Sequence, residues 1–292
     1  MNLRAQLNYA TLVSGFSDTL RNRSVFFRLM AENAFTRAPF HVPFGVVSGP
    51  ASGSVVPEGA SIPVSRLSLA NVTLEPRKVA ALVVMTADLV RNTSAASQAL
   101  FARELRGAVS DAADGALFDS TIDSSTPQFT SSGNDVDDIR ADLFQMLSAV
   151  NSVGSAALYW VAAPDVAKRL STIATSGGSD AFPNASALGG ELLNLPLLVS
   201  SVLPAGTLYL LNAGSIAAEA GAIEVADSEH ATVQMNDEPT GDSVTPTASA
   251  LVSMLQTNSV ALRATVMMAV ERLRVDAIAK LDGISWMGEA TA

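Results

Sequence analysis

The segment from residue 40 to residue 78 constrains this chain most, because it predicts a long β-hairpin that lacks a core of its own. Its first limb alternates apolar residues with others, at Phe40, Val42, Phe44 and Val46. Turn-forming residues fill positions 48–53, and Pro43 makes this limb an edge strand. Pro57 and Pro63 stiffen the connection to the second limb. An isolated hairpin is marginally stable in water, so we expect this one, like residues 1–39, to become ordered on another surface.

The return limb carries two pairs of apolar residues that are one position out of phase, Leu67 with Leu69 and Val72 with Leu74. A phase change of this kind predicts a β-bulge near residues 70–71. We expect the four side chains to form an apolar edge that a neighbouring molecule covers. Charged residues along the hairpin are expected to set the register of that contact: Glu58, Arg66, Glu75, Arg77 and Lys78.

A strand and a long helix are expected after the hairpin. Residues 79–85 form an almost unbroken apolar run, which predicts a strand buried on both faces. Residues 94–120 predict a helix with one apolar stripe, made by Phe101, Leu105, Val109, Ala112 and Ala116. Its charged residues are expected to face away from that stripe: Arg103, Arg106, Asp111 and Asp114. Gly107 and Gly115 weaken a helix, so a close packing contact is the expected reason for each.

The rest of the chain predicts helices and strands that are segregated and do not alternate strictly. Helices are expected at 135–150, from Pro164 onward, and at 246–256. Strands are expected at 156–162, 197–201, 207–212, 223–226, 232–235, 259–271 and 275–281. This distribution favours the α+β class.

The composition predicts that many apolar side chains are buried, and the sequence contains no segment that would span a membrane. Apolar residues make up 48% of the 292 residues and charged residues 16%, and no run of 18 uncharged apolar residues exists. Burial between subunits is the simplest destination for the excess apolar surface.

Charge is unevenly distributed along the chain. The net charge is −10, and no Lys or Arg lies between Arg169 and Arg263, so the chain is not a general binder of nucleic acid. Residues 1–40 differ, because five arginines against two acidic residues give a local balance of +3. This basic segment is expected either to meet an acidic partner or to be solvated.

No pattern typical of an enzyme occurs in the sequence. Phosphate-binding, dinucleotide-binding, zinc-protease and serine-hydrolase motifs are absent, and the chain has no cysteine and two histidines. We therefore predict no catalytic residue, no cofactor and no metal site. Trp160 and Trp286 are interpreted as packing or interface anchors. A hydrolase that uses carboxylates of the acidic block is a remote alternative, and it requires a concave site with a perturbed carboxylate.

Four segments resemble the major capsid proteins of tailed bacteriophages, in the same order along the chain. Residues 55–92 are similar to the extended loop of that family, and residues 94–120 to its long spine helix. Residues 192–216 are similar to its axial domain. The stretch ALVSMLQTNSVALRA, at 250–264, resembles the family's return into the central domain.

The resemblance covers about residues 40–282 and implies the Hong Kong phage capsid fold, an α+β fold. It implies an N-terminal arm (1–39), an extended loop (40–78), a peripheral domain with the spine helix (79–152), an axial domain (153–242) and a return to the peripheral domain (243–292). It also implies a structural virion protein that assembles with itself into hexamers and pentamers of an icosahedral head around double-stranded DNA. A portal, a separate scaffolding protein and a decoration protein are the other implied partners. An encapsulin, the shell protein of a bacterial nanocompartment with the same fold, is the alternative.

Two departures from the family pattern carry predictions of their own. Some relatives join subunits through a Lys–Asn isopeptide bond, but Ile62 stands where that lysine would lie. Asn258 resembles the partner asparagine, yet the strand after it lacks a glutamate at the expected place, so no covalent link is expected. The chain also starts almost directly with the arm, so the scaffolding domain of some relatives is expected to be a separate protein or to have been removed.

Overall fold

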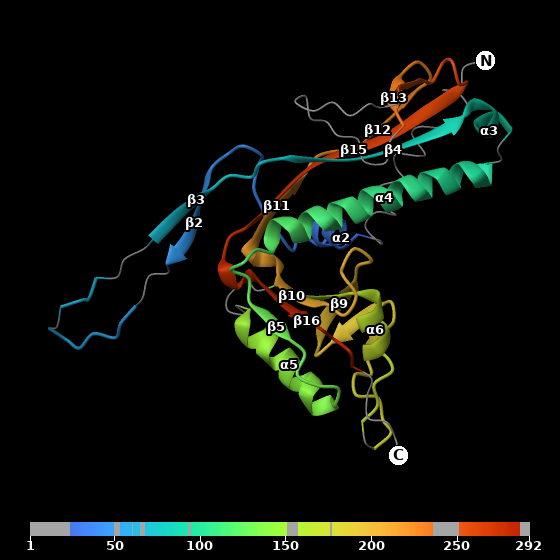
Figure 1. The fold of residues 1–292 in the computed structure, drawn as a ribbon. Coiled ribbons are helices and arrows are strands. Elements are labelled where there is room, and N and C mark those ends of the chain that lie inside the picture. Colours follow the sequence, from blue (N-terminus) through green and yellow to red (C-terminus); the bar gives the residue numbers. More distant parts are fainter. Residues whose placement is uncertain are drawn as a thin grey trace. The chain divides into compact units, whose positions relative to one another are not determined.

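The computed structural model describes residues 24–49, 53–59, 61–64, 68–92, 95–150, 157–175, 177–235 and 251–286 (Figure 1). Residues 1–23 of the predicted arm, and Arg66 and Leu67 of the predicted interface, lie outside these ranges. Contacts divide the chain into two compact units, and each is described by itself. Within the described ranges, none of the helices combines the length and the apolar character that crossing a lipid bilayer requires.

The first unit, formed by Lys78–Ala113 and Gly221–Met267, is built mainly on paired strands. Its elements are β4 (Arg77–Thr86), α3 (Ala87–Asn92), the first part of α4 (Ala95–Thr121), β12 (Glu224–Ser228), β13 (Thr232–Gln234), β14 (Leu251–Ser253) and most of β15 (Ser259–Arg272). β15 pairs antiparallel with β12, with Ala264 opposite Val225, and it also pairs with β4. β13 and β14 form a separate antiparallel pair.

Two predictions for the first unit are wrong. β4 is not buried on both faces, because Val79 and Met85 are buried while Leu82 is half exposed. An apolar run shows that both faces of a strand carry apolar side chains. It does not show whether other elements of the same chain cover both faces. The helix expected at 246–256 is, where described, strand β14 followed by turns at 254–258. Pairing with β13 outweighs the weak helical pattern of these residues.

The second unit contains Ser24–Arg77, Asp114–Ala220 and the described part of Met268–Ala292. A seven-stranded mixed sheet runs in the order β5 (Gln128–Thr130), β16 (Ile278–Asp282), β10 (Leu208–Asn212), β6 (Leu158–Ala162), β9 (Leu195–Val199), β8 (Gly189–Leu192), β7 (Ala185–Ser186). Its helices are α2 (Val25–Ala31), the end of α4, α5 (Val136–Ala149), α6 (Pro164–Leu170) and the 3-10 turns η2 (Ala213–Ser215) and η3 (Val275–Ala277). The remaining strands are β1 (Thr36–Arg37), β2 (Phe44–Gly49), β3 (Ser68–Val72) and β11 (Ile216–Ala220).

The core of the second unit lies along β10, which is buried over its whole length. Leu210 of β10 is opposite Trp160 on β6 and Ala279 on β16. Trp160 and Trp286 are both fully buried within their own chain, so they are packing anchors of one subunit. The α+β class predicted from the sequence is confirmed.

α4 matches the helix predicted at 94–120, but one prediction about its faces is wrong. Leu105 and Val109 are buried as expected, whereas Ala112 is exposed and Asp114, expected to face away, is only 3% exposed. The buried face follows every fourth residue, and four residues of a helix with about 3.6 residues per turn advance by about 400°, so that face turns by about 40° at each step through Leu105, Val109, Ala113 and Leu117. A stripe defined at one end of the helix therefore misplaces residues near the other end.

Candidate assembly surface

The described hairpin has two strands, β2 and β3, which pair antiparallel with Phe44 opposite Val72. Its β-bulge lies on the first limb, between Val47 and Gly49, and not near residues 70–71 as predicted. Ser48 is the extra residue at that bulge. The apolar residues of the return limb fall out of phase for another reason: β3 ends at Val72, so Leu74 lies beyond the strand.

Leu74 was predicted to face a neighbouring molecule, and that prediction is wrong. Its side chain is 0% exposed and packs with Ala38, Ala217 and Ala269 of the same subunit. An isolated β-bridge between Phe40 and Leu74 joins the two limbs at this level. The base of the hairpin is thus fixed on its own unit, because its last apolar residue belongs to that unit's core.

Farther from the base, the hairpin exposes apolar side chains that its own subunit does not cover. Leu69 is 64% exposed and Val64 is 96% exposed, while Val72 is half-buried. Among the hairpin residues that the structure describes, the large exposed apolar side chains are Val42, Val47, Val55, Ile62, Val64 and Leu69. Sequence reasoning missed Val55 and Val64, because they lie outside the alternating limbs from which the apolar edge was predicted.

Most of the charged residues predicted to set the register lie at the surface. Glu58, Arg77 and Lys78 are exposed, and a carboxylate oxygen of Glu75 lies 3.7 Å from Nδ1 of His41. Burial raises the pKa of the Glu271 carboxyl, and the positive charge of Arg77 opposes that rise. At the base of the hairpin, Arg77 therefore interacts electrostatically with Glu271 of its own unit.

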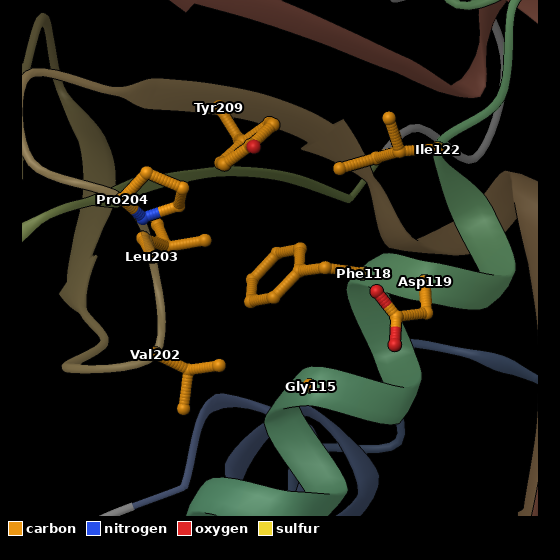
Figure 2. A pocket seen from close by; sticks show the side chains of 8 residues that line it. All are labelled: Gly115, Phe118, Asp119, Ile122, Val202, Leu203, Pro204 and Tyr209. Atoms are coloured by element: carbon orange, nitrogen blue, oxygen red, sulfur yellow. The ribbon is translucent and has the colours of Figure 1, made fainter.

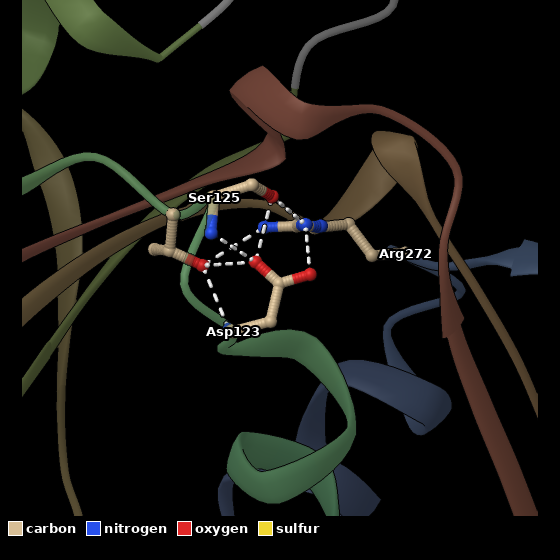
Figure 3. Close-up of polar contacts among 4 residues, drawn as sticks. Asp123, Ser125 and Arg272 are labelled. Atoms are coloured by element: carbon tan, nitrogen blue, oxygen red, sulfur yellow. Dashed lines mark hydrogen bonds and ion pairs between the residues drawn. The ribbon is translucent and has the colours of Figure 1, made fainter.

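Arg272, at the end of β15, holds the loop that follows α4 (Figure 3). Its side chain is almost buried, and its Nη2 donates to Asp123 Oδ2 and to Ser125 Oγ, each at 2.7 Å. Nη1 donates to Thr126 Oγ1 at 2.8 Å. Hydrogen bonds from Ser125, followed by Arg272, lower the pKa of the Asp123 carboxyl to about 2. The next residue, Leu273, borders the cluster around Leu74, so this network supports the base of the hairpin.

The buried carboxylate of Asp114 fastens α2 to α4. Its Oδ1 accepts hydrogen bonds from Ser24 Oγ at 2.6 Å and from the Phe26 amide at 3.0 Å. Its Oδ2 accepts from the Val25 amide at 3.1 Å and from Ser200 Oγ at 3.0 Å. A helix of seven residues is too short to be stable alone, so these bonds and the burial of Phe26 hold α2 in place. The expectation that residues 24–38 become ordered chiefly when subunits assemble is therefore wrong.

A buried carboxyl with a perturbed pKa is often catalytic, but Asp114 has a structural role. Burial raises its pKa, and the hydrogen bonds from Ser24, Phe26, Val25 and Ser200 oppose that rise. All these donors belong to the packed interior, so the carboxyl does not face a site that a substrate can enter. In the part of the chain that the structure describes, no three His, Cys, Asp or Glu side chains are grouped to hold a metal ion.

Comparison with known proteins shows the family to which the chain belongs. The model of the phage capsid family matches residues 10–283, nearly the whole chain. The chain belongs to the phage capsid family. A capsid polyprotein of Pseudomonas phage PAJU2 is 30% identical in an alignment 298 positions long, which covers 94% of this chain. The chain spans 44% of that relative's length.

Solved structures of phage proteins share the fold. A chain of Gordonia phage Cozz matches with a TM-score of 0.62 at 14% identity, covering 87% of this chain and 85% of that one. A virus-like particle from Pyrococcus furiosus matches with a TM-score of 0.56 at 10% identity, covering 94% and 100% of the two chains. This member of the phage capsid family is a structural protein of the virion capsid, as the sequence resemblance predicted.

Asn258, the residue that resembles the asparagine of the isopeptide bond in some relatives, lies in the described part of the first unit. Asn258 adopts a positive φ of 47° after β14, and it lines a small pocket together with Glu229 and Ser259. Its Nδ2 lies 3.5 Å from Asp88 Oδ1. The acid in this pocket, Glu229, precedes Asn258 in the chain and does not lie on the following strand, where the sequence analysis looked for one. Ile62 is exposed at the hairpin tip and offers no amine, so the absence of a covalent link stays a prediction.

Proposed function

We propose that this protein is the shell subunit of a phage head, and that its copies form hexamers and pentamers that close around double-stranded DNA. The hairpin is the observation that carries this proposal. Its tip exposes Val55, Ile62 and Val64, and β3 exposes Leu69, while Leu74 fixes the base to the subunit. Apolar side chains gathered on one element support contact with a neighbouring copy, because such surface is otherwise left in water.

Apolar area supplies most of the proposed contact energy. Covering four such side chains contributes on the order of 6–12 kcal/mol per subunit, at about 1.5–3 kcal/mol each. The cost of ordering the loop and of association is subtracted from this sum. An exposed ion pair contributes only about 0–1 kcal/mol. Glu58, Arg66 and Lys78 therefore set the register of the contact, and they add little to its strength.

The proposed role is structural and not enzymatic. The net charge of −10 supports a shell that does not hold packaged DNA tightly, since affinity for DNA comes mainly from neutralising phosphates. A portal, a separate scaffolding protein and a decoration protein are the further partners in this proposal.

Electron microscopy of the purified protein tests the proposal. We expect closed icosahedral shells, and we expect particles recovered from infected cells to contain nuclease-resistant double-stranded DNA. Protein that stays monomeric at every concentration and salt condition would contradict the proposed function.

The second candidate function is the shell of a nanocompartment. The observation in its favour is the likeness of the fold to the Pyrococcus furiosus particle. That likeness supports the fold alone. The contents of the particles separate the two candidates, because particles filled with a second protein and free of DNA would support the nanocompartment.

A further inference from the structure

A pocket of about 340 Å³ in the second unit lies beside the last turns of α4 (Figure 2). Two of its walls are aromatic, because the rings of Phe118 and Tyr209 stack with their centroids 5.3 Å apart. Aliphatic residues complete the lining. A Cβ at Gly115, which also lines the pocket, would meet Val202 Cγ1 at 3.7 Å, an ordinary contact, so the close approach expected at this glycine is not what requires it. Pockets of about 300–1,000 Å³ take small organic molecules, so a phenyl ring fits this one.

The pocket carries two polar side chains, and neither has a polar partner within the described part of the chain. Asp119 is exposed, and its carboxylate makes no hydrogen bond or ion pair there. Tyr209 is only 4% exposed, and its hydroxyl makes no hydrogen bond there either. The hydroxyl of a buried tyrosine usually has a partner. The lining therefore suits an occupant that brings an aromatic group together with positively charged hydrogen-bond donors.

The outer face of α5, in the same unit, presents an aromatic side chain to solvent. Phe144 is 69% exposed, whereas the other large hydrophobic side chains exposed in the described ranges are aliphatic or methionine. Residues three and four positions away are neighbours on a helix surface. Two of these neighbours, Ala141 and Ser148, are exposed and short, so they leave the ring uncovered.

A positive charge accompanies this ring. Arg140 lies four residues before Phe144, on the same face of α5. Its side chain is 55% exposed, and its Nη1 lies 3.9 Å from Asp137 Oδ1, which is longer than a charge-assisted hydrogen bond. The guanidinium therefore keeps its donors for another carboxylate. A ring with a guanidinium one turn away complements a pocket that has aromatic walls and the unpaired carboxylate of Asp119.

We propose that the pocket beside α4 binds Phe144 of a second copy of this chain, and that Arg140 of that copy pairs with Asp119. The ring packs against Phe118 and Tyr209, and the guanidinium donates to the carboxylate. The two surfaces differ, so the contact is head to tail, the type that closes into rings when the rotation between copies permits it. The inference rests on the proposed function and names one contact through which neighbouring subunits join.

Photo-crosslinking in assembled shells tests the contact directly. Phe144 is replaced by p-benzoylphenylalanine, which keeps the aromatic ring and, on irradiation, attaches to C–H groups that it touches. Shells are assembled from a mixture of isotope-labelled and unlabelled subunits, so an adduct between a labelled and an unlabelled peptide joins two copies. We expect mass spectrometry to find such adducts at residues 115–122 and 202–209.

Two outcomes separate this inference from the proposed function. Shells whose adducts lie in the hairpin of a neighbouring copy, or shells without an adduct between copies, would overturn the contact and leave the proposed function standing. Wild-type protein that forms no shells would overturn both.

Exchanged charges give an independent readout, which is the subunit concentration at which shells form. We expect Arg140→Asp and Asp119→Arg each to raise this concentration by about tenfold, since each places like charges together, and the double variant to restore it. Asp180→Arg is the matched control, because Asp180 is an exposed acid of the same unit outside the pocket. Combined with Arg140→Asp it keeps the net charge and should restore nothing. Rescue by Asp180→Arg that equals rescue by Asp119→Arg would contradict the proposed pairing.

Discussion

Asp114 joins Ser24 to α4 across 90 residues of sequence, and its four hydrogen bonds cannot all be kept by an amide. Asp114→Asn places an NH₂ group opposite at least one donor, so a buried donor loses its partner. We expect a loss of about 2–3 kcal/mol in the free energy of unfolding, measured by chemical denaturation. Asp137→Asn, on an exposed side chain of α5, should change it by less than about 0.5 kcal/mol. Equal effects of the two changes would show that Asp114 is not an anchor.

The pKa of Asp123 gives a prediction about acid stability. Its folded pKa, about 2, lies below the ordinary value of 3.8, chiefly because Ser125 donates to the carboxylate. The stability that this group adds is present above the ordinary value and is lost as the pH falls toward 2. Between pH 5 and pH 3, the denaturation midpoint of the wild type should therefore fall more steeply than that of Asp123→Asn. Parallel slopes would contradict the assignment.

At the scale of one element, the hairpin has a base that belongs to its own subunit and a distal part that does not. Leu74→Ala opens a cavity in the cluster with Ala217 and Ala269, and we expect it to reduce the free energy of unfolding by about 2–5 kcal/mol. Leu69→Ala is the matched control, because Leu69 is 64% exposed, and its effect on the unassembled subunit should be below about 0.5 kcal/mol. Equal losses in the two variants would mean that the distal part also packs on its own subunit.

The same element shows what its sequence could and could not reveal. Alternation and turn residues located the two strands, because a pleated strand places alternate side chains on one face. They could not assign Leu74, since an apolar residue at the end of a strand looks the same whether its own chain or a neighbour covers it. For the same reason, the apolar run of β4 was wrongly taken as buried on both faces. Asp114 was misassigned because its partners, Ser24 and Ser200, are distant in sequence.

At the scale of the whole molecule, the order of segments along the chain identified the family, which composition alone did not. The apolar excess of the composition indicated burial between subunits, and the sequence contained no enzyme motif that pointed to another family. The alternatives that remained, a phage head and a nanocompartment, share one fold, and the contents of a shell are not encoded in the fold of its subunit.

Covalent linkage of the shell is a property of the whole assembly. Asn258 and Glu229 share a pocket, but residues 40–77 of the hairpin contain no lysine that could supply an amine. Boiled and denatured particles should therefore run as a single band near 30.2 kDa. A ladder of higher oligomers that survives denaturation would show that another amine serves the reaction.

The central claim is that the distal part of the hairpin closes the shell, and a shortened hairpin tests it most directly. Gly49 pairs with Ser68 at the last rung of the β2–β3 ladder, so residues 50–67 can be replaced by Asn-Gly, a two-residue turn that suits such a ladder. The variant keeps Leu74 and the base. Electron microscopy of this variant beside the wild type should show closed shells only for the wild type, while the variant unfolds with unchanged cooperativity. Closed shells of normal size from the shortened variant would contradict the account.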